Sequence, residues 1–85
     1  MKRWRIRAVF GRTPTEETLD RLLSGFLKQA AKANFGAFGD CGAADMNFML
    51  EPNGGNDIVV QTEVAALVVW LQLQPEITSV ASEHK

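Results

Sequence analysis

The chain has 85 residues, of which 46% are hydrophobic and 22% charged, and its formal net charge is −1 at pH 7. A chain of this length predicts a single domain over residues 1–85, and its composition excludes a disordered polymer. The near-neutral charge disfavours general binding to nucleic acid or to an anionic membrane, because both require a positive surplus.

The cysteine content and the apolar runs bear on where the protein works. Cys41 is the only cysteine, so no disulfide can form within the chain. The longest apolar run, VAALVVWL at residues 64–71, is far shorter than the ~20 residues that cross a membrane as a helix. We therefore expect a cytoplasmic protein without a membrane partner.

Residues 3–10, RWRIRAVF, alternate strictly between two kinds of side chain. A period of two residues predicts a strand with one buried face. The apolar face, which we expect in the core, carries Trp4, Ile6, Ala8 and Phe10. The face expected in solvent carries Arg3, Arg5, Arg7 and Val9.

Residues 14–33 follow with the pattern of a helix. Thr13 suits the N-cap, Pro14 the first helical position and Glu16 the third position of a capping box. A single apolar stripe at helical spacing contains Leu19, Leu22, Leu23, Phe26, Leu27 and Ala30. We expect Asn34 or Gly36 to end the helix in a left-handed conformation.

The middle of the chain is divided by glycines. GAFGDCG at residues 36–42 predicts a loop, and residues 44–51 alternate again as a strand. Its apolar face carries Ala44, Met46, Phe48 and Leu50. PNGGN at residues 52–56 predicts a turn, and DIVVQT at residues 57–62 predicts a third strand with Ile58 and Val60 inward. The outward side chains of that strand are Asp57, Val59 and Gln61.

Residues 62–74 form the most ambiguous element. We predict a helix capped by Thr62 and stopped before Pro75, although its valines would also suit a strand. Residues 76–84 predict a fourth strand at an edge of the sheet. The order βαββαβ resembles the ferredoxin-like sandwich, an α+β fold with a four-stranded antiparallel sheet and two helices on one face. Many unrelated functions use this fold, so it names no activity.

The alternation in residues 3–10 raises the question of a nucleic-acid platform. Sheets that bind RNA stack bases on exposed aromatic rings, whereas the expected solvent face offers arginines and no ring. Arg3, Arg5 and Arg7 are therefore candidates for an anionic-partner face, and the absence of a ring disfavours nucleic acid as its occupant. Asp45, Glu51 and Asp57 are expected on the same face and would partly neutralise the arginines.

No motif predicts catalysis, and we expect no enzyme. Cys41 and His84 would have to meet to form a nucleophile and base, but His84 lies one residue from the C-terminal end of the sequence. Cys41 has no second metal ligand at a usable spacing. The glycines of residues 36–42 do not match a phosphate loop, which follows a strand and opens a helix. We predict no cofactor and no metal.

The second helix is the most informative segment for function. Val64, Leu67, Val68 and Leu71 are expected to face the core at helical spacing. The opposite side then carries a candidate partner interface: Ala66, Val69, Trp70 and Leu73. If the element were a strand or a shifted helix, these side chains would enter the core instead.

These patterns predict a non-enzymatic protein-interaction module. A homodimer through the second helix is the leading hypothesis, and another protein is the alternative partner. Two other functions stay open: a small-ligand-binding regulatory domain with Gly11 in the turn after the first strand, and a weak nucleic-acid binder.

One resemblance adds to the prediction. RAVFGRTPTEETLDRLL at residues 7–23, followed by the βαββαβ order, is similar to small accessory proteins of unknown function from actinobacterial phages. The resemblance implies expression in a bacterial cytoplasm and action by binding a host or phage protein.

Overall fold

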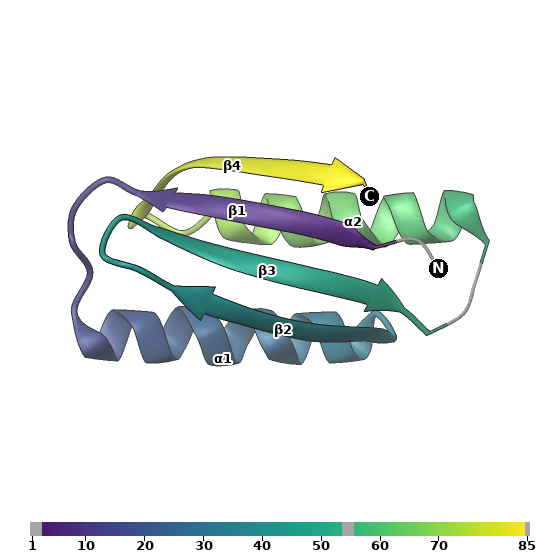
Figure 1. Cartoon of the computed structure of the whole chain (residues 1–85), viewed down its shortest axis with the longest axis horizontal. Coiled ribbons are helices and arrows are strands. Elements are labelled where there is room, and N and C mark those ends of the chain that lie inside the picture. The colour runs from purple at the N-terminus through teal and green to yellow at the C-terminus, as the bar shows by residue number, and fades with distance from the viewer. Residues whose placement is uncertain (1–2, 54–55, 85) are drawn as a thin grey trace.

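The computed structural model describes residues 3–53 and 56–84, without the side chain of Asp57. The predicted turn at residues 52–56 therefore lies partly outside the described residues. In chain order the elements are β1 (Trp4–Phe10), α1 (Glu16–Lys32), β2 (Phe35–Cys41), β3 (Asp45–Pro52), α2 (Asp57–Gln72) and β4 (Ile77–His84) (Figure 1).

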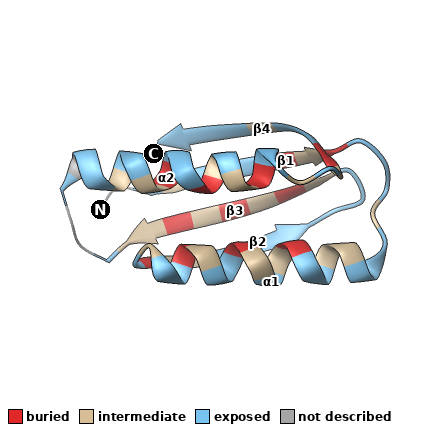
Figure 2. Cartoon of the chain, turned by 180° about the vertical axis from the view of Figure 1, so that it is seen from behind, coloured by how far each residue is buried: buried red, intermediate tan, exposed pale blue. Residues whose placement is uncertain are grey.

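The four strands form one antiparallel sheet in the order β2-β3-β1-β4. Both helices cover the same face, with α1 beside β2 and α2 beside β4, and the other face is uncovered (Figures 1 and 2). We call this uncovered side the open face. The predicted ferredoxin-like α+β fold is confirmed, including the edge position of the last strand.

The core lies between the sheet and the helices. The alternation expected for β1 and β3 is observed within both strands, because Ile6, Ala8, Phe10 and three residues of β3 are buried. The three are Met46, Phe48 and Leu50. The prediction for Ala44 is wrong: it precedes β3 and is exposed. At the centre the rings of Phe26 and Phe48 stack with their centroids 4.0 Å apart. Trp4, at the end of β1, is only half-buried and stacks on His84.

The ends of α1 follow local hydrogen bonding. The predicted cap was wrong by two residues: Thr15, not Thr13, is the N-cap, and its hydroxyl accepts a hydrogen bond from the Thr18 N–H at 3.2 Å. Pro14 thus precedes the cap instead of opening the helix. At the other end, Asn34 adopts the left-handed conformation with φ 64°, which confirms one of the two expected stops.

The predicted loop at residues 36–42 is wrong, because most of it is the edge strand β2. Phe35 is buried and Ala37 lies opposite Leu50, so the segment completes the core beside α1. Close packing leaves no room for a side chain at Gly39. A β-carbon there would lie 2.6 Å from both the Asn47 carbonyl oxygen and the Phe48 ring. The glycine therefore allows β3 and the Phe48 ring to pack closely against this strand.

The predicted third strand at residues 57–62 is also wrong. Asn56 caps α2 by accepting a hydrogen bond from the Val59 N–H at 2.9 Å, so the helix begins at Asp57 and not near Thr62. Val60 lies one helical turn before the buried Val64, and it is half-buried on the same side of the helix. Asp57, Val59 and Gln61 consequently belong to α2 and not to the sheet.

A glycine in the middle of α1 gives a sharp prediction about the contact between the helices. A β-carbon at Gly25 would lie 2.9 Å from two atoms of the Trp70 ring. Helix propensity alone favours Gly25→Ala by ~1 kcal/mol. We expect the replacement to destabilise the wild-type chain but to stabilise a Trp70→Leu chain, from which the ring is absent. A double-mutant cycle by urea unfolding measures this, and the same sign in both backgrounds would contradict the contact.

Candidate functional site

The outer side of α2 carries an uninterrupted run of exposed apolar and small side chains, which we call the α2 stripe. The exposed Val59 lies just beyond one edge of this run. The α2 stripe itself consists of Ile58, Thr62, Ala65, Ala66, Val69 and Leu73. At 100° per residue these positions fall within an arc of about 100°. They lie opposite the buried Val64, Leu67 and Leu71, and Figure 2 shows the outer side of α2 as exposed.

The exposure of the α2 stripe is large for apolar side chains. Ile58 is 78% exposed, Val69 51% and Leu73, the residue that ends the helix, 74%. The polar group of Thr62 is already satisfied, because its hydroxyl donates to the Ile58 carbonyl oxygen at 2.9 Å. The α2 stripe contains no charged residue. Contiguous exposed apolar surface of this kind marks association sites in small domains.

Three of the four interface residues predicted from the sequence lie on this surface: Ala66, Val69 and Leu73. Trp70 does not share it. Its indole is half-buried and faces α1, with its centroid 6.3 Å from that of Phe26. Ile58 and Thr62 were missed because residues 57–62 were assigned to a strand. The capping pattern that begins at Asn56 was the signal that would have placed them on the helix.

The open face of the sheet presents the three predicted arginines, but two of them are already paired. Arg3 contacts Glu51 at 2.9 Å and Arg7 contacts Asp45 at 2.8 Å, as the alternation predicted for both acids. Among the described residues, Arg5 has no ion-pair partner. All three are exposed, and exposed pairs contribute only ~0–1 kcal/mol each.

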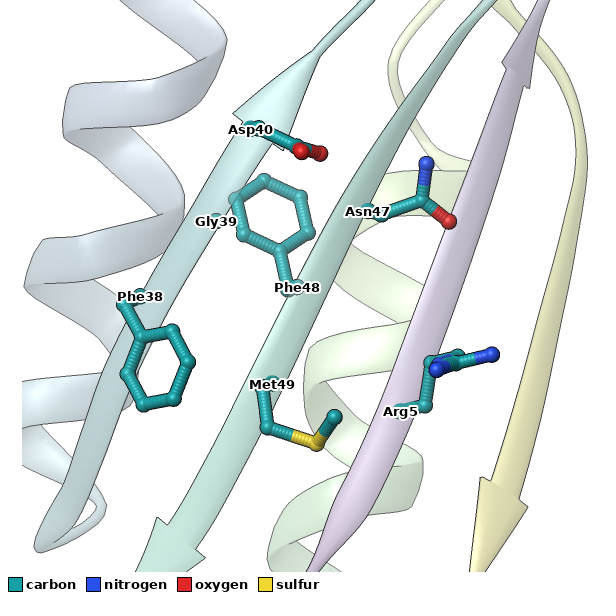
Figure 3. A pocket seen from close by; sticks show the side chains of 7 residues that line it. All are labelled: Arg5, Phe38, Gly39, Asp40, Asn47, Phe48 and Met49. Atoms are coloured by element: carbon teal, nitrogen blue, oxygen red, sulfur yellow. The ribbon is translucent and has the colours of Figure 1, made fainter.

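Contrary to expectation, the open face does carry a ring. Phe38 on β2 is 59% exposed and lies in register with Met49 on β3, which pairs with Arg5 on β1. These side chains border a shallow hollow of about 470 Å³ that Asn47 also lines (Figure 3). The ring was missed because residues 36–42 were expected to form a loop.

The charges of the open face balance one another. By register, the side that presents the three arginines also presents acidic residues from β2, β3 and β4: Asp40, Asp45, Glu51 and Glu83. Single-stranded nucleic acid needs a positively charged track as well as a stacking ring. Phe38 also lies on an edge strand, away from the central strands that carry the stacking rings of RNA-binding sheets.

A second hollow, of about 390 Å³, lies where β1 leads into α1, beside Gly11, Arg12, Thr15 and Glu76. Arg21 holds Glu76, one of the lining residues, in place. Its guanidinium donates to Glu76 at 2.6 Å and to the Gln74 side chain at 3.2 Å, which ties α1 to the connection before β4. A hydrogen bond from the Glu76 backbone N–H, and then the one from Arg21, lower the pKa of Glu76 below its usual value.

The lowered pKa of Glu76 predicts how stability depends on pH. A carboxylate whose pKa is depressed by folding stabilises the native state above its unfolded-state pKa, and this contribution is lost as the pH falls through the folded-state pKa. We expect Glu76→Gln to be less stable than wild type at pH 7 and to converge with it in acid. Urea unfolding at several pH values measures this, with Asp40→Asn as a control. A constant difference at all pH values would contradict the assignment.

The structure also locates Cys41 and His84, the pair that a nucleophile and base would require. Across the strands, Cys41 is in register with Met46 on β3 and Ala8 on β1. His84 on β4 is in register with Trp4 on β1. Ala8 and Trp4 are four residues apart along β1, which is ~13 Å, so the side chains of Cys41 and His84 are not brought together. Within residues 3–53 and 56–84, no three His, Cys, Asp or Glu residues are grouped to hold a metal ion. None of the described helices has the length and apolar character needed to cross a membrane.

Comparisons with known proteins show the fold alone. No family model and no curated sequence matches the chain. Among solved structures, the de novo designed protein Foldit4 superposes with a TM-score of 0.75 at 11% identity, covering 99% of this chain and 94% of that one. The C-terminal domain of MgtC from Mycobacterium tuberculosis gives 0.67 at 12% identity, covering 100% and 88%. The structured domain of Drosophila melanogaster Boca gives 0.66 at 15% identity, covering 98% and 97%.

Proposed function

We propose that the chain is a non-enzymatic protein-association module that acts through the α2 stripe, with a second copy of itself as the first partner. The observation that carries this proposal is the exposure of Ile58, Val69 and Leu73 along one side of a single helix. A helix that lies on a sheet is normally polar on its outer side. Covering this side would remove apolar surface from water and add stability to a small core.

The alternatives on the open face have less support. Its ion pairs leave Arg5 as the candidate contact for an anionic partner, and the neighbouring acids oppose nucleic acid. Its hollow is lined by both polar and apolar groups, without a run of apolar side chains comparable to the α2 stripe. We therefore place nucleic-acid binding below protein association.

Self-association predicts that stability depends on protein concentration, because a dimer is favoured over two unfolded chains by mass action. Two short helices bury an area at the low end of stable interfaces, so we expect a dissociation constant of about micromolar order. The midpoint of thermal unfolding should rise over a hundredfold concentration range starting at about 5 µM. A constant midpoint, together with a monomeric mass, would contradict self-association.

The resemblance to phage accessory proteins points to a different occupant of the same surface. In that case the chain works in a bacterial cytoplasm, and a host protein covers the α2 stripe. The purified chain would then remain monomeric at all concentrations. Binding to a candidate host protein would be lost on introducing a charge at Val69 but kept after a change on the open face.

A small-ligand-binding regulatory domain is the second candidate, favoured by the hollow between the β1–α1 connection and Glu76. Its lining offers both a guanidinium, from Arg12, and a carboxylate, so it could hold a small molecule with charges of both signs. A thermal-shift screen of amino acids and small metabolites tests this function. Stabilisation that Glu76→Gln abolishes would favour it, whereas no shift across the screen would count against it.

A further inference from the structure

We infer that two copies pair α2 against α2 in antiparallel orientation, about a two-fold axis that passes between Ala65 and Ala66. This inference rests on the proposed function and specifies the geometry of the dimer. It follows from the spacing of the six positions along the α2 stripe, which is the same when counted from either end, and from the similar sizes of the side chains at matched positions.

The symmetry is visible in the residue numbers. A two-fold axis between positions 65 and 66 matches Ile58 with Leu73 of the second copy, and Thr62 with Val69 of the second copy. At each end of the interface Ile58 meets Leu73, which are both large. One turn closer to the axis Thr62 meets Val69, which is nearly equal in size, and at the axis alanines meet alanines. An isologous interface requires this kind of self-complementarity, because each patch must fit itself.

The small residues at the centre allow the two helix backbones to approach closely. Ala65 and Ala66 are both exposed, so none of the described residues covers the crossing point. Of the matched pairs, only the one with Thr62 brings in a polar group. Its hydroxyl is already bonded to the Ile58 carbonyl oxygen, so covering it leaves no unsatisfied donor. The α2 stripe can therefore become buried without a polar penalty.

Electrostatics favour the antiparallel orientation over the parallel one. The two acidic residues of α2, Asp57 and Glu63, lie in its first seven positions, and its remaining length has no charged residue. A parallel pair would bring the acidic N-terminal halves of both helices side by side. An antiparallel pair separates them and sets the positive end of each helix dipole beside the negative end of the other.

Cysteine cross-linking distinguishes the two orientations. In a Cys41→Ser background, Thr62→Cys and Val69→Cys chains are oxidised separately and as a mixture, with one chain tagged so that mixed dimers are resolved by mass. In the antiparallel dimer equal residues at position 62 are ~10.5 Å apart along the axis, from seven helical positions of ~1.5 Å. This exceeds the ~7 Å that a disulfide can span between α-carbons.

We expect the mixture to give the mixed disulfide, which joins position 62 of one chain to position 69 of the other, and each chain alone to give little cross-linking. Self-linked dimers of each chain alone, without the mixed product, would overturn the antiparallel geometry in favour of a parallel one. A dimeric mass before oxidation, with neither the mixed disulfide nor self-linked dimers after it, would also overturn the antiparallel geometry. A monomeric mass for the uncross-linked chains would instead refute the proposed self-association. Ala81→Cys, exposed on the open face, is the control and should not cross-link.

Discussion

Replacing Phe48 with alanine is expected to lower the free energy of unfolding by about 3–5 kcal/mol. Phe48 is 1% exposed and stacks on Phe26 across the middle of the core, so removing its ring leaves a cavity between β3 and α1. Small domains have a total stability of only about 5–15 kcal/mol. The variant should therefore be largely unfolded at temperatures that the wild type tolerates, as urea unfolding followed by circular dichroism will show.

The neighbouring Met49 provides the matched control for this prediction. It is adjacent in sequence but lies on the open face, half-buried in register with Phe38. Met49→Ala should cost no more than about 1 kcal/mol, the range usual for surface changes with modest packing. If both variants lost the same stability, the assignment of β3 side chains to the two faces of the sheet would be contradicted.

Replacing Val69 with glutamate is expected to weaken self-association by about 100-fold or more, which corresponds to ~2.7 kcal/mol. Val69 lies on the exposed side of α2, about one helical turn from the proposed crossing point, where it faces Thr62 of the second copy. Both copies would then bury an unpaired carboxylate against apolar side chains, a costly arrangement without a partner. Because Val69 is 51% exposed within one chain, the fold of the monomer should be nearly unaffected.

Phe38→Glu is the control for Val69→Glu, because it makes the same kind of change at a comparably exposed site on the open face. Sedimentation equilibrium should show the wild-type association for Phe38→Glu and a monomer for Val69→Glu. Equal weakening by both variants would indicate an effect of net charge and not of the α2 stripe. Trp70→Glu is unsuitable for this purpose, since the indole packs against α1 and its loss would disturb the core.

The sequence predicted elements reliably where a buried face imposed its period. Residues 4–10 and 45–51 alternate because successive side chains point to opposite faces of the sheet, and the structure buries Ile6 and Phe48 as expected. The predicted pattern ran one residue too far at Ala44, which precedes the strand and is exposed. The long apolar stripe of α1 likewise fixed that helix, whereas its cap was misplaced by two residues. Two threonines flank Pro14, and only the hydrogen bond to Thr18 determines which of them caps the helix.

The two misassigned segments failed for identifiable physical reasons. GAFGDC lacks β-branched residues, but pairing with β3 and the close packing at Gly39 make it a strand. DIVVQT has strong strand propensity, but the Asn56 cap and the burial of Val64 and Leu71 extend the helix through it. Tertiary packing overrides local propensity in both segments. These errors hid Phe38 on the open face and Ile58 at one end of the α2 stripe.

The mass of the wild-type chain in solution is the most direct test of association through α2. Light scattering across a concentration series should show a mass that rises from one chain of 9.4 kDa toward twice that value. A mass that stays at that of one chain up to about millimolar concentration, well above the expected micromolar dissociation constant, would contradict the account.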